Sequence, residues 1–154
     1  MRDSSSAVRL IRRSAIVEHS AAQLHAIVAD VAAYPRYLPW CLDARSGEHT
    51  AAGILTTMSV GIRGLRQSCT TLHAGRAPES IDITLVEGPF RSFQAHWRFT
   101  PLGDGAARID FEMAYEFSGP AVSKALGPLF ESIADTMVDA FTRRAAALHG
   151  RAAR

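Results

Sequence analysis

Residues 93–117 read FQAHWRFTPLGDGAARIDFEMAYEF, and this stretch decides the fold. Apolar and polar residues alternate on both sides of Gly103-Asp104-Gly105, which is the pattern of two strands joined by a short turn. A turn centred on these residues pairs positions whose numbers sum to about 208, so Trp97 lies opposite Phe111. An odd sum would place aromatic residues opposite charged ones. The stretch therefore predicts an antiparallel hairpin with one large aromatic face.

The chain before this hairpin continues the same two-residue period. Alternation is clear in residues 54–62 and 81–85, and the breaks between the expected strands are short, such as Ala52-Gly53 and Gly88-Pro89. None of these breaks could hold a crossover helix, so consecutive strands must pair in antiparallel fashion. Residues 42–117 are therefore expected to form a meander of about six strands.

A long amphipathic helix is expected after the strands, from Pro120 to Leu148. Gly150 supplies a stop signal, and Gly127-Pro128 predicts a kink or a broken first turn. Apolar residues recur at helical spacing and form one stripe. The stripe consists of Val122, Leu126, Leu129, Phe130, Ile133, Met137, Phe141 and Leu148.

The N-terminal part completes the order of elements. Residues 8–18 predict a strand, and Ser20 is the expected N-cap of a helix over residues 21–31. The next segment, residues 34–41, reads YPRYLPWC, and its two prolines allow only a short helical turn and a rigid apolar loop. This order predicts a two-layer α+β fold, with a curved antiparallel sheet packed on the long C-terminal helix.

Size and composition fit one domain over residues 8–148, with loose tails at residues 1–7 and 149–154. The chain has 154 residues, of which 47% are hydrophobic, and its net charge is only +2, which argues against disorder and against DNA binding. No apolar run is long enough to cross a bilayer. Two isolated cysteines, Cys41 and Cys69, favour a reducing cytoplasm.

The sequence contains no recognisable catalytic or metal-binding motif. The six histidines have no spacing suited to a shared metal, and Cys41 has no histidine partner in sequence. The carboxylates Asp110, Glu112 and Glu116 alternate with the apolar face, so they are expected on a solvated outer face. His96 is expected opposite Glu112 there. We therefore predict no catalytic residue, no metal and no enzymatic activity.

Four blocks, in this order, resemble a known family: residues 34–41, VEGPFR at 86–91, WRFTPL at 97–102 and MVDAFTRRA at 137–145. The resemblance is to the coenzyme-Q-binding branch of the START-like, polyketide-cyclase-like superfamily, whose bacterial members include ribosome-association toxins. It covers roughly residues 8–148. It implies a helix-grip fold, in which the sheet wraps around the C-terminal helix and leaves a hydrophobic tunnel between them. Pro128 departs from the family pattern.

The resemblance further implies that the tunnel binds ubiquinone or a related polyprenyl lipid. The protein would then support respiratory electron transport as a carrier or chaperone, with no cofactor beyond this ligand. We expect it in the cytoplasm or at the inner face of the membrane, with transient membrane contact. From periodicity alone, a plain packed core is the better interpretation, because the pattern cannot distinguish a filled core from a lined cavity. The expected lining is Tyr37, Trp40, Phe90, Phe93, Trp97, Phe111, Met113, Leu126, Phe130, Ile133 and Met137.

Two alternatives stay open. A ribosome-associated regulator, which interferes with subunit joining, would need an exposed basic surface, and only Arg9, Arg12 and Arg13 suggest one. A cyclase- or dehydratase-like enzyme acting on an aromatic polyketide would need polar groups inside the cavity. The inner face expected from residues 93–117 is almost wholly apolar, which counts against the enzyme.

Overall fold

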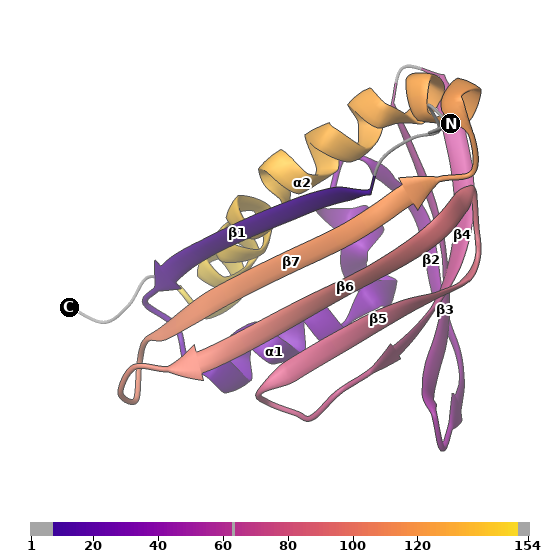
Figure 1. Ribbon diagram of the computed structural model, residues 1–154. Coiled ribbons are helices and arrows are strands. Elements are labelled where there is room, and N and C mark those ends of the chain that lie inside the picture. Colours follow the sequence, from indigo (N-terminus) through magenta and orange to yellow (C-terminus); the bar gives the residue numbers. More distant parts are fainter. Residues whose placement is uncertain (1–7, 63, 151–154) are drawn as a thin grey trace.

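The computed structural model describes residues 8–62 and 64–150, and it shows a curved antiparallel sheet with its helices on the concave side (Figure 1). Within these residues, seven strands are arranged in the order β1-β7-β6-β5-β4-β3-β2. The expected helix-grip fold is therefore confirmed. Its elements are β1 (Arg9–Val17), α1 (Ala21–Ala29), the 3-10 helix η1 (Val31–Arg36), β2 (Cys41–Thr50), β3 (Gly53–Ile62), β4 (Leu65–Ala74), β5 (Ser80–Glu87), β6 (Phe90–Pro101), β7 (Ala107–Phe117) and α2 (Pro120–His149).

The hairpin of β6 and β7 has the predicted register. Trp97 pairs with Phe111, and both side chains are almost completely buried on the concave face. Their ring centroids lie 4.5 Å apart. The turn contains Gly103 with φ of 95°, a left-handed conformation that glycine adopts without steric cost. Local alternation and turn chemistry are thus sufficient to position this half of the sheet.

The first strand joins the sheet beside the last one. β1 pairs antiparallel with β7 along its whole length, from Arg9 opposite Tyr115 to Val17 opposite Ala107. This pairing brings together residues about a hundred positions apart in the sequence. It makes β1 one edge of the sheet and β2 the other.

The convex face carries the charged residues of β6 and β7, as expected, but their partners differ from the prediction. His96 lies opposite Glu112 in the register, yet its Nδ1 contacts Asp82 Oδ1 of β5 at 2.9 Å. Glu112 instead accepts a hydrogen bond from Arg12 Nε of β1 at 2.6 Å. Both pairs lie at the surface and are partly accessible to solvent, so each contributes little to stability.

Helix α2 is continuous from Pro120 to His149, so the broken first turn expected at Gly127-Pro128 does not occur. The helix ends at Gly150, whose φ of 76° and N–H bond to Ala146 O form the predicted stop. His149 thus belongs to the helix and not to a loose tail, while residues 1–7 and 151–154 lie outside the described residues. Leu148 is exposed and does not belong to the buried stripe.

Two aromatic clusters hold α2 against the sheet. At the C-terminal cluster, the Phe141 ring contacts Tyr34 and Tyr37 of the η1 region and Trp97 of β6, with centroids 5.3 to 5.9 Å apart. At the N-terminal cluster, Phe130 contacts rings of β6 and β7, with centroids 5.2 to 5.9 Å apart. Those rings are Phe90, Tyr115 and Phe117.

The C-terminal cluster should dominate the stability of the α2 contact. Phe141→Ala removes a buried ring that joins three elements, and we expect the free energy of unfolding to fall by about 3–5 kcal/mol. Leu148→Ala is the matched control, because this exposed side chain of the same helix should change stability by less than about 0.5 kcal/mol. Urea denaturation followed by circular dichroism measures both. Equal losses for the two variants would contradict the packing described here.

Candidate ligand-binding site

An internal cavity of about 110 Å³ lies between the two aromatic clusters, under α2. Ile133 and Met137 line it from the helix, one and two turns beyond Phe130. The sheet contributes residues from β3 to β7, most of them apolar. Those sheet residues are Met58, Val60, Cys69, Thr71, His73, Ile83, Phe93, Ala95, Trp97, Phe111 and Met113.

The structure brings together most of the residues predicted as ligand contacts. Eight of them line the cavity: Trp40, Phe93, Trp97, Phe111, Met113, Phe130, Ile133 and Met137. Phe90 and Leu126 are buried but do not line it, and Phe90 belongs instead to the N-terminal aromatic cluster. Tyr37 lies outside the cavity, in a neighbouring groove.

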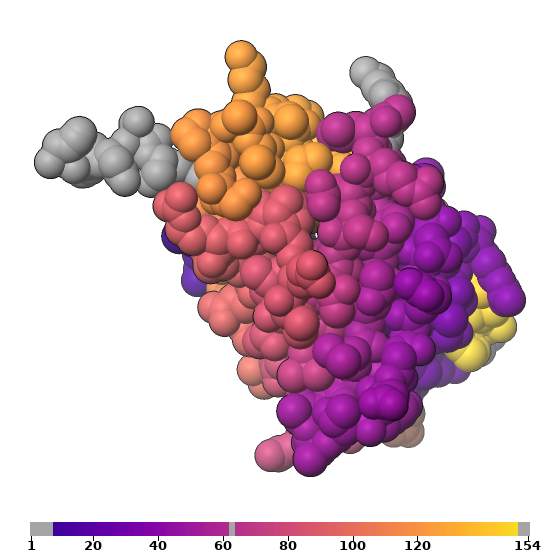
Figure 2. Space-filling view, turned by 90° about the vertical axis from the view of Figure 1, so that its right-hand side faces the viewer, coloured from indigo at the N-terminus to yellow at the C-terminus, as the bar shows by residue number. Residues whose placement is uncertain are grey.

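This neighbouring groove is much larger, with a volume of about 850 Å³. It separates the C-terminal half of α2 from the β3–β4 hairpin and from the loop that follows η1. Its apolar lining includes Leu42, Leu65 and Ala140, and its rim carries Arg66 and Arg144. Figure 2 views the molecule from this side, with the magenta and purple strands in front and the yellow end of α2 beyond them.

In place of one expected tunnel, the structure shows two neighbouring spaces of unequal size between sheet and helix. Trp40 lines both of them, so this residue lies where they adjoin. Ligand pockets for small molecules typically measure roughly 300–1,000 Å³. The groove falls in this range, whereas the cavity alone is too small for a whole polyprenyl lipid.

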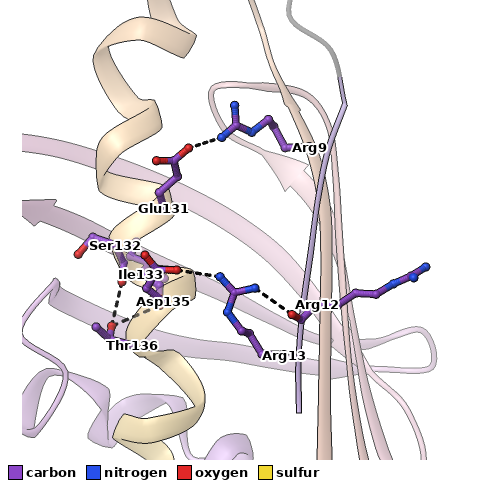
Figure 3. A network of polar contacts seen from close by, with 8 residues as sticks. All are labelled: Arg9, Arg12, Arg13, Glu131, Ser132, Ile133, Asp135 and Thr136. Atoms are coloured by element: carbon purple, nitrogen blue, oxygen red, sulfur yellow. Dashed lines mark hydrogen bonds and ion pairs between the residues drawn. The ribbon is translucent and has the colours of Figure 1, made fainter.

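The opposite flank of α2 is attached to the edge strand β1 (Figure 3). Arg9 forms an ion pair with Glu131, and Arg13 Nη2 lies 2.7 Å from Asp135 Oδ1 one helical turn later. Arg12 points to the other side of the strand. Because all three arginines have carboxylate partners, the basic surface expected from them is largely neutralised.

Three polar residues of β4 were missed by the sequence analysis. Cys69, Thr71 and His73 share the concave face of the strand and line the cavity. Burial lowers the pKa of His73 to about 4, so its imidazole is neutral at pH 7. The two-residue spacing of these positions was a usable signal, but residues 65–74 were not among the stretches in which alternation was recognised, namely 54–62, 81–85 and 93–117.

The polar groups of the cavity are uncharged at neutral pH. No carboxylate lines it among the residues that the structure describes, and burial raises the pKa of Cys69 to about 11, so the thiol stays protonated. Within residues 8–62 and 64–150 there is no group of side chains suited to hold a metal ion. In the same segments, no helix is long and apolar enough to cross a membrane.

The neutral state of His73 predicts a pH-dependent stability. The unfolded chain protonates this histidine near 6.5 but the folded protein only near 4. The unfolded state thus binds more protons in this window, and stability falls as the pH is lowered through it. His73→Phe should flatten this part of the stability curve, whereas Met58→Leu in the same cavity should not. Parallel curves for wild type and His73→Phe, measured by urea denaturation, would show that the imidazole is not held neutral.

Comparisons with known proteins agree with this geometry. Residues 17–142 match the family model described as polyketide cyclase / dehydrase and lipid transport. The chain is 35% identical over 143 residues to the ribosome association toxin RatA of Vibrio cholerae, covering 93% of this chain and 99% of the relative. It is 24% identical over 149 residues to the mitochondrial coenzyme Q-binding protein coq10 of Schizosaccharomyces pombe, covering 90% and 87%.

Among solved structures, the Zhui aromatase/cyclase from Streptomyces sp. R1128 superposes with a TM-score of 0.75. That alignment covers 90% of this chain and 94% of the cyclase at 16% identity, so it supports the fold alone. The match of the family model spans most of the chain, and the toxin-named relative is similar over almost its full length. This chain therefore belongs to the polyketide cyclase / dehydrase and lipid transport family.

Proposed function

We propose that the protein binds an isoprenoid quinone, such as ubiquinone, or a related polyprenyl lipid, and acts as a carrier or chaperone rather than as an enzyme. This proposal rests on one observation: a largely apolar groove and a small cavity lie next to each other, and Trp40 lines both. A long flexible tail suits the groove, and a compact group suits the cavity. The coq10 relative is named as a coenzyme Q-binding protein, which supports the same ligand class.

The apolar lining supports binding through buried area. Each Å² of apolar surface removed from water contributes about 25 cal/mol before the costs of ordering. Methionines from three elements, Met58, Met113 and Met137, line the cavity and can adapt to ligands of different shape. Leu42, at the groove, is partly exposed. It would favour the transient membrane contact that loading of a lipid requires.

The first test blocks the groove without disturbing the core. Ala140 lines the groove from α2 and is only half-buried, so Ala140→Trp should fill part of it. We expect bound lipid to fall roughly tenfold, because about 60 Å² of lost apolar contact corresponds to about 1.5 kcal/mol. The measurement is mass spectrometry of lipids retained after detergent-free purification.

Ala125→Trp is the matched control, since Ala125 is exposed on the same helix and does not line the groove. It should keep the wild-type lipid load. A folded Ala140→Trp protein that carries the same load as Ala125→Trp would show that the groove does not hold the ligand. A wild-type protein without any bound lipid, even after incubation with ubiquinone, would refute the proposed function itself.

A second candidate function is association with the ribosome, which the name of the 35% identical relative supports. The surface proposed here is the arginine rim of the groove, formed by Arg66, Arg143 and Arg144. Arg143 pairs with Asp139, and Arg144 lies 4.6 Å from the Tyr37 ring centroid. Within the described part of the chain, neither Arg66 nor Arg144 forms an ion pair, so both charges are available to phosphate groups.

The double variant Arg66→Glu/Arg144→Glu should weaken co-sedimentation with ribosomal particles by roughly tenfold, which corresponds to about 1.4 kcal/mol for two reversed surface charges. The association should also weaken with added salt. Arg76→Glu, an exposed arginine in the turn between β4 and β5, is the control and should bind as wild type. Co-sedimentation of the double variant at the wild-type level would exclude the arginine rim as the contact surface.

A further inference from the structure

The concave face of β3 and β4 carries buried polar groups in an otherwise apolar surrounding. Thr71 and His73 line the cavity, and Thr71 Oγ1 lies 2.9 Å from His73 Nε2. Thr56 of β3 is the direct cross-strand partner of Thr71, so its side chain lies on the same face. Thr56 itself does not line the cavity but lies beside Thr71, and we call these three residues the polar wall.

Part of this polar wall has no partner. Thr56 is only 1% exposed, yet its hydroxyl has no hydrogen-bond partner among the residues that the structure describes. Buried polar groups are normally paired, because leaving one unpaired costs free energy. This unpaired hydroxyl adds to the polar character of the buried face on which Thr71 and His73 line the cavity.

A second unpaired donor lies at the junction of cavity and groove. Trp40 is 7% exposed, and within the described segments its indole Nε1–H has no acceptor. Trp40 lines both spaces, so a ligand in either of them lies against this residue. Hydrogen-bond donors therefore lie in the polar wall of the cavity and at Trp40, where the cavity adjoins the groove.

The chemistry of these groups favours a ligand with acceptor oxygens. Thr71 and the neutral His73 carry one proton donor each, and one of these protons is used in the hydrogen bond between them. One donor of this pair and the indole N–H of Trp40, which can only donate, remain for a ligand. No carboxylate lines the cavity, so a cationic or strongly donating head group would find no matching acceptor charge. A carbonyl oxygen, which only accepts, fits this set of donors.

The size of the cavity limits what can carry this oxygen. An apolar protein cavity of about 150 Å³ holds one benzene molecule. The cavity here measures about 110 Å³, which is the scale of a single ring, and its methionine side chains can yield some additional room. The groove, at about 850 Å³, has space for an attached chain.

We propose that the ligand enters ring first, so that a carbonyl-bearing six-membered ring occupies the cavity and its oxygens accept hydrogen bonds from the polar wall and from Trp40 Nε1. The attached apolar chain then lies in the groove. This inference rests on the proposed binding of an isoprenoid quinone and adds its orientation and the groups that recognise it. The site would therefore discriminate a quinone from a hydrocarbon of equal chain length.

The test compares two probes, a ubiquinone with two isoprene units and a hydrocarbon with the same chain but no ring. Wild type should bind the quinone at least tenfold more tightly than the hydrocarbon. Thr71→Val/His73→Phe removes two polar groups at similar volume and should reduce this preference about tenfold, with hydrocarbon affinity unchanged. Thr100→Val/His96→Phe makes the same two changes on the convex face and should keep the wild-type preference.

A measurement on the wild-type protein does not depend on whether the variant folds. Hydrogen bonds to the ring oxygens should lower the infrared carbonyl stretching frequency of bound quinone below its value in an apolar solvent. An unshifted carbonyl band, or a folded Thr71→Val/His73→Phe protein with the wild-type preference, would overturn the ring-first orientation while leaving lipid binding intact. Wild-type protein that binds neither probe would instead refute the proposed function, and the orientation with it.

Discussion

The separation between α2 and the sheet depends on two phenylalanines of the helix. Phe130 and Phe141 each insert among rings of the opposite layer, one at either end of the contact. They lie eleven residues apart, about 16 Å along a helix. Between them the helix presents Ile133 and Met137, which do not fill the space down to the sheet. The cavity is therefore a consequence of where the large rings are placed.

The two flanks of α2 are unequal, and this asymmetry determines access. On one flank, Arg9 and Arg13 connect β1 to carboxylates of the helix, so this side is closed by ion pairs (Figure 3). On the other flank the helix faces the groove, with small residues such as Ala140 and Ala147 along its wall. Small side chains leave room for an occupant without any cost to the core. A ligand would accordingly reach the cavity from the side of β3 and β4.

The fold itself does not separate binding proteins from enzymes, since the same architecture occurs in an aromatase/cyclase. The chemistry that the cavity of this chain can support depends on the groups that line it. Its polar groups are hydroxyls, a thiol and an imidazole whose pKa is lowered to about 4 by burial, and no carboxylate lies among them. Such groups can donate hydrogen bonds at neutral pH. Among the described residues of the lining, His73 has no carboxylate partner that would make it a strong general base.

The sequence by itself determined the local parts of this structure: the strand periods, the register of the 93–117 hairpin, the capped helix after Ser20 and the apolar stripe of α2. These follow from interactions between residues close in the chain, where turn chemistry and side-chain alternation leave few choices. The pattern of large apolar residues showed which side chains are buried, and the family resemblance added the expectation of a cavity, of which eight predicted residues form part of the lining. Only the tertiary structure decided the pairing of β1 with β7, the partners of Arg9 and Arg13, and the division of the expected tunnel into groove and cavity. It also brought Thr56, Thr71 and His73 under the helix. Alternation shows which residues share a face, but the space in front of that face depends on packing between elements distant in sequence.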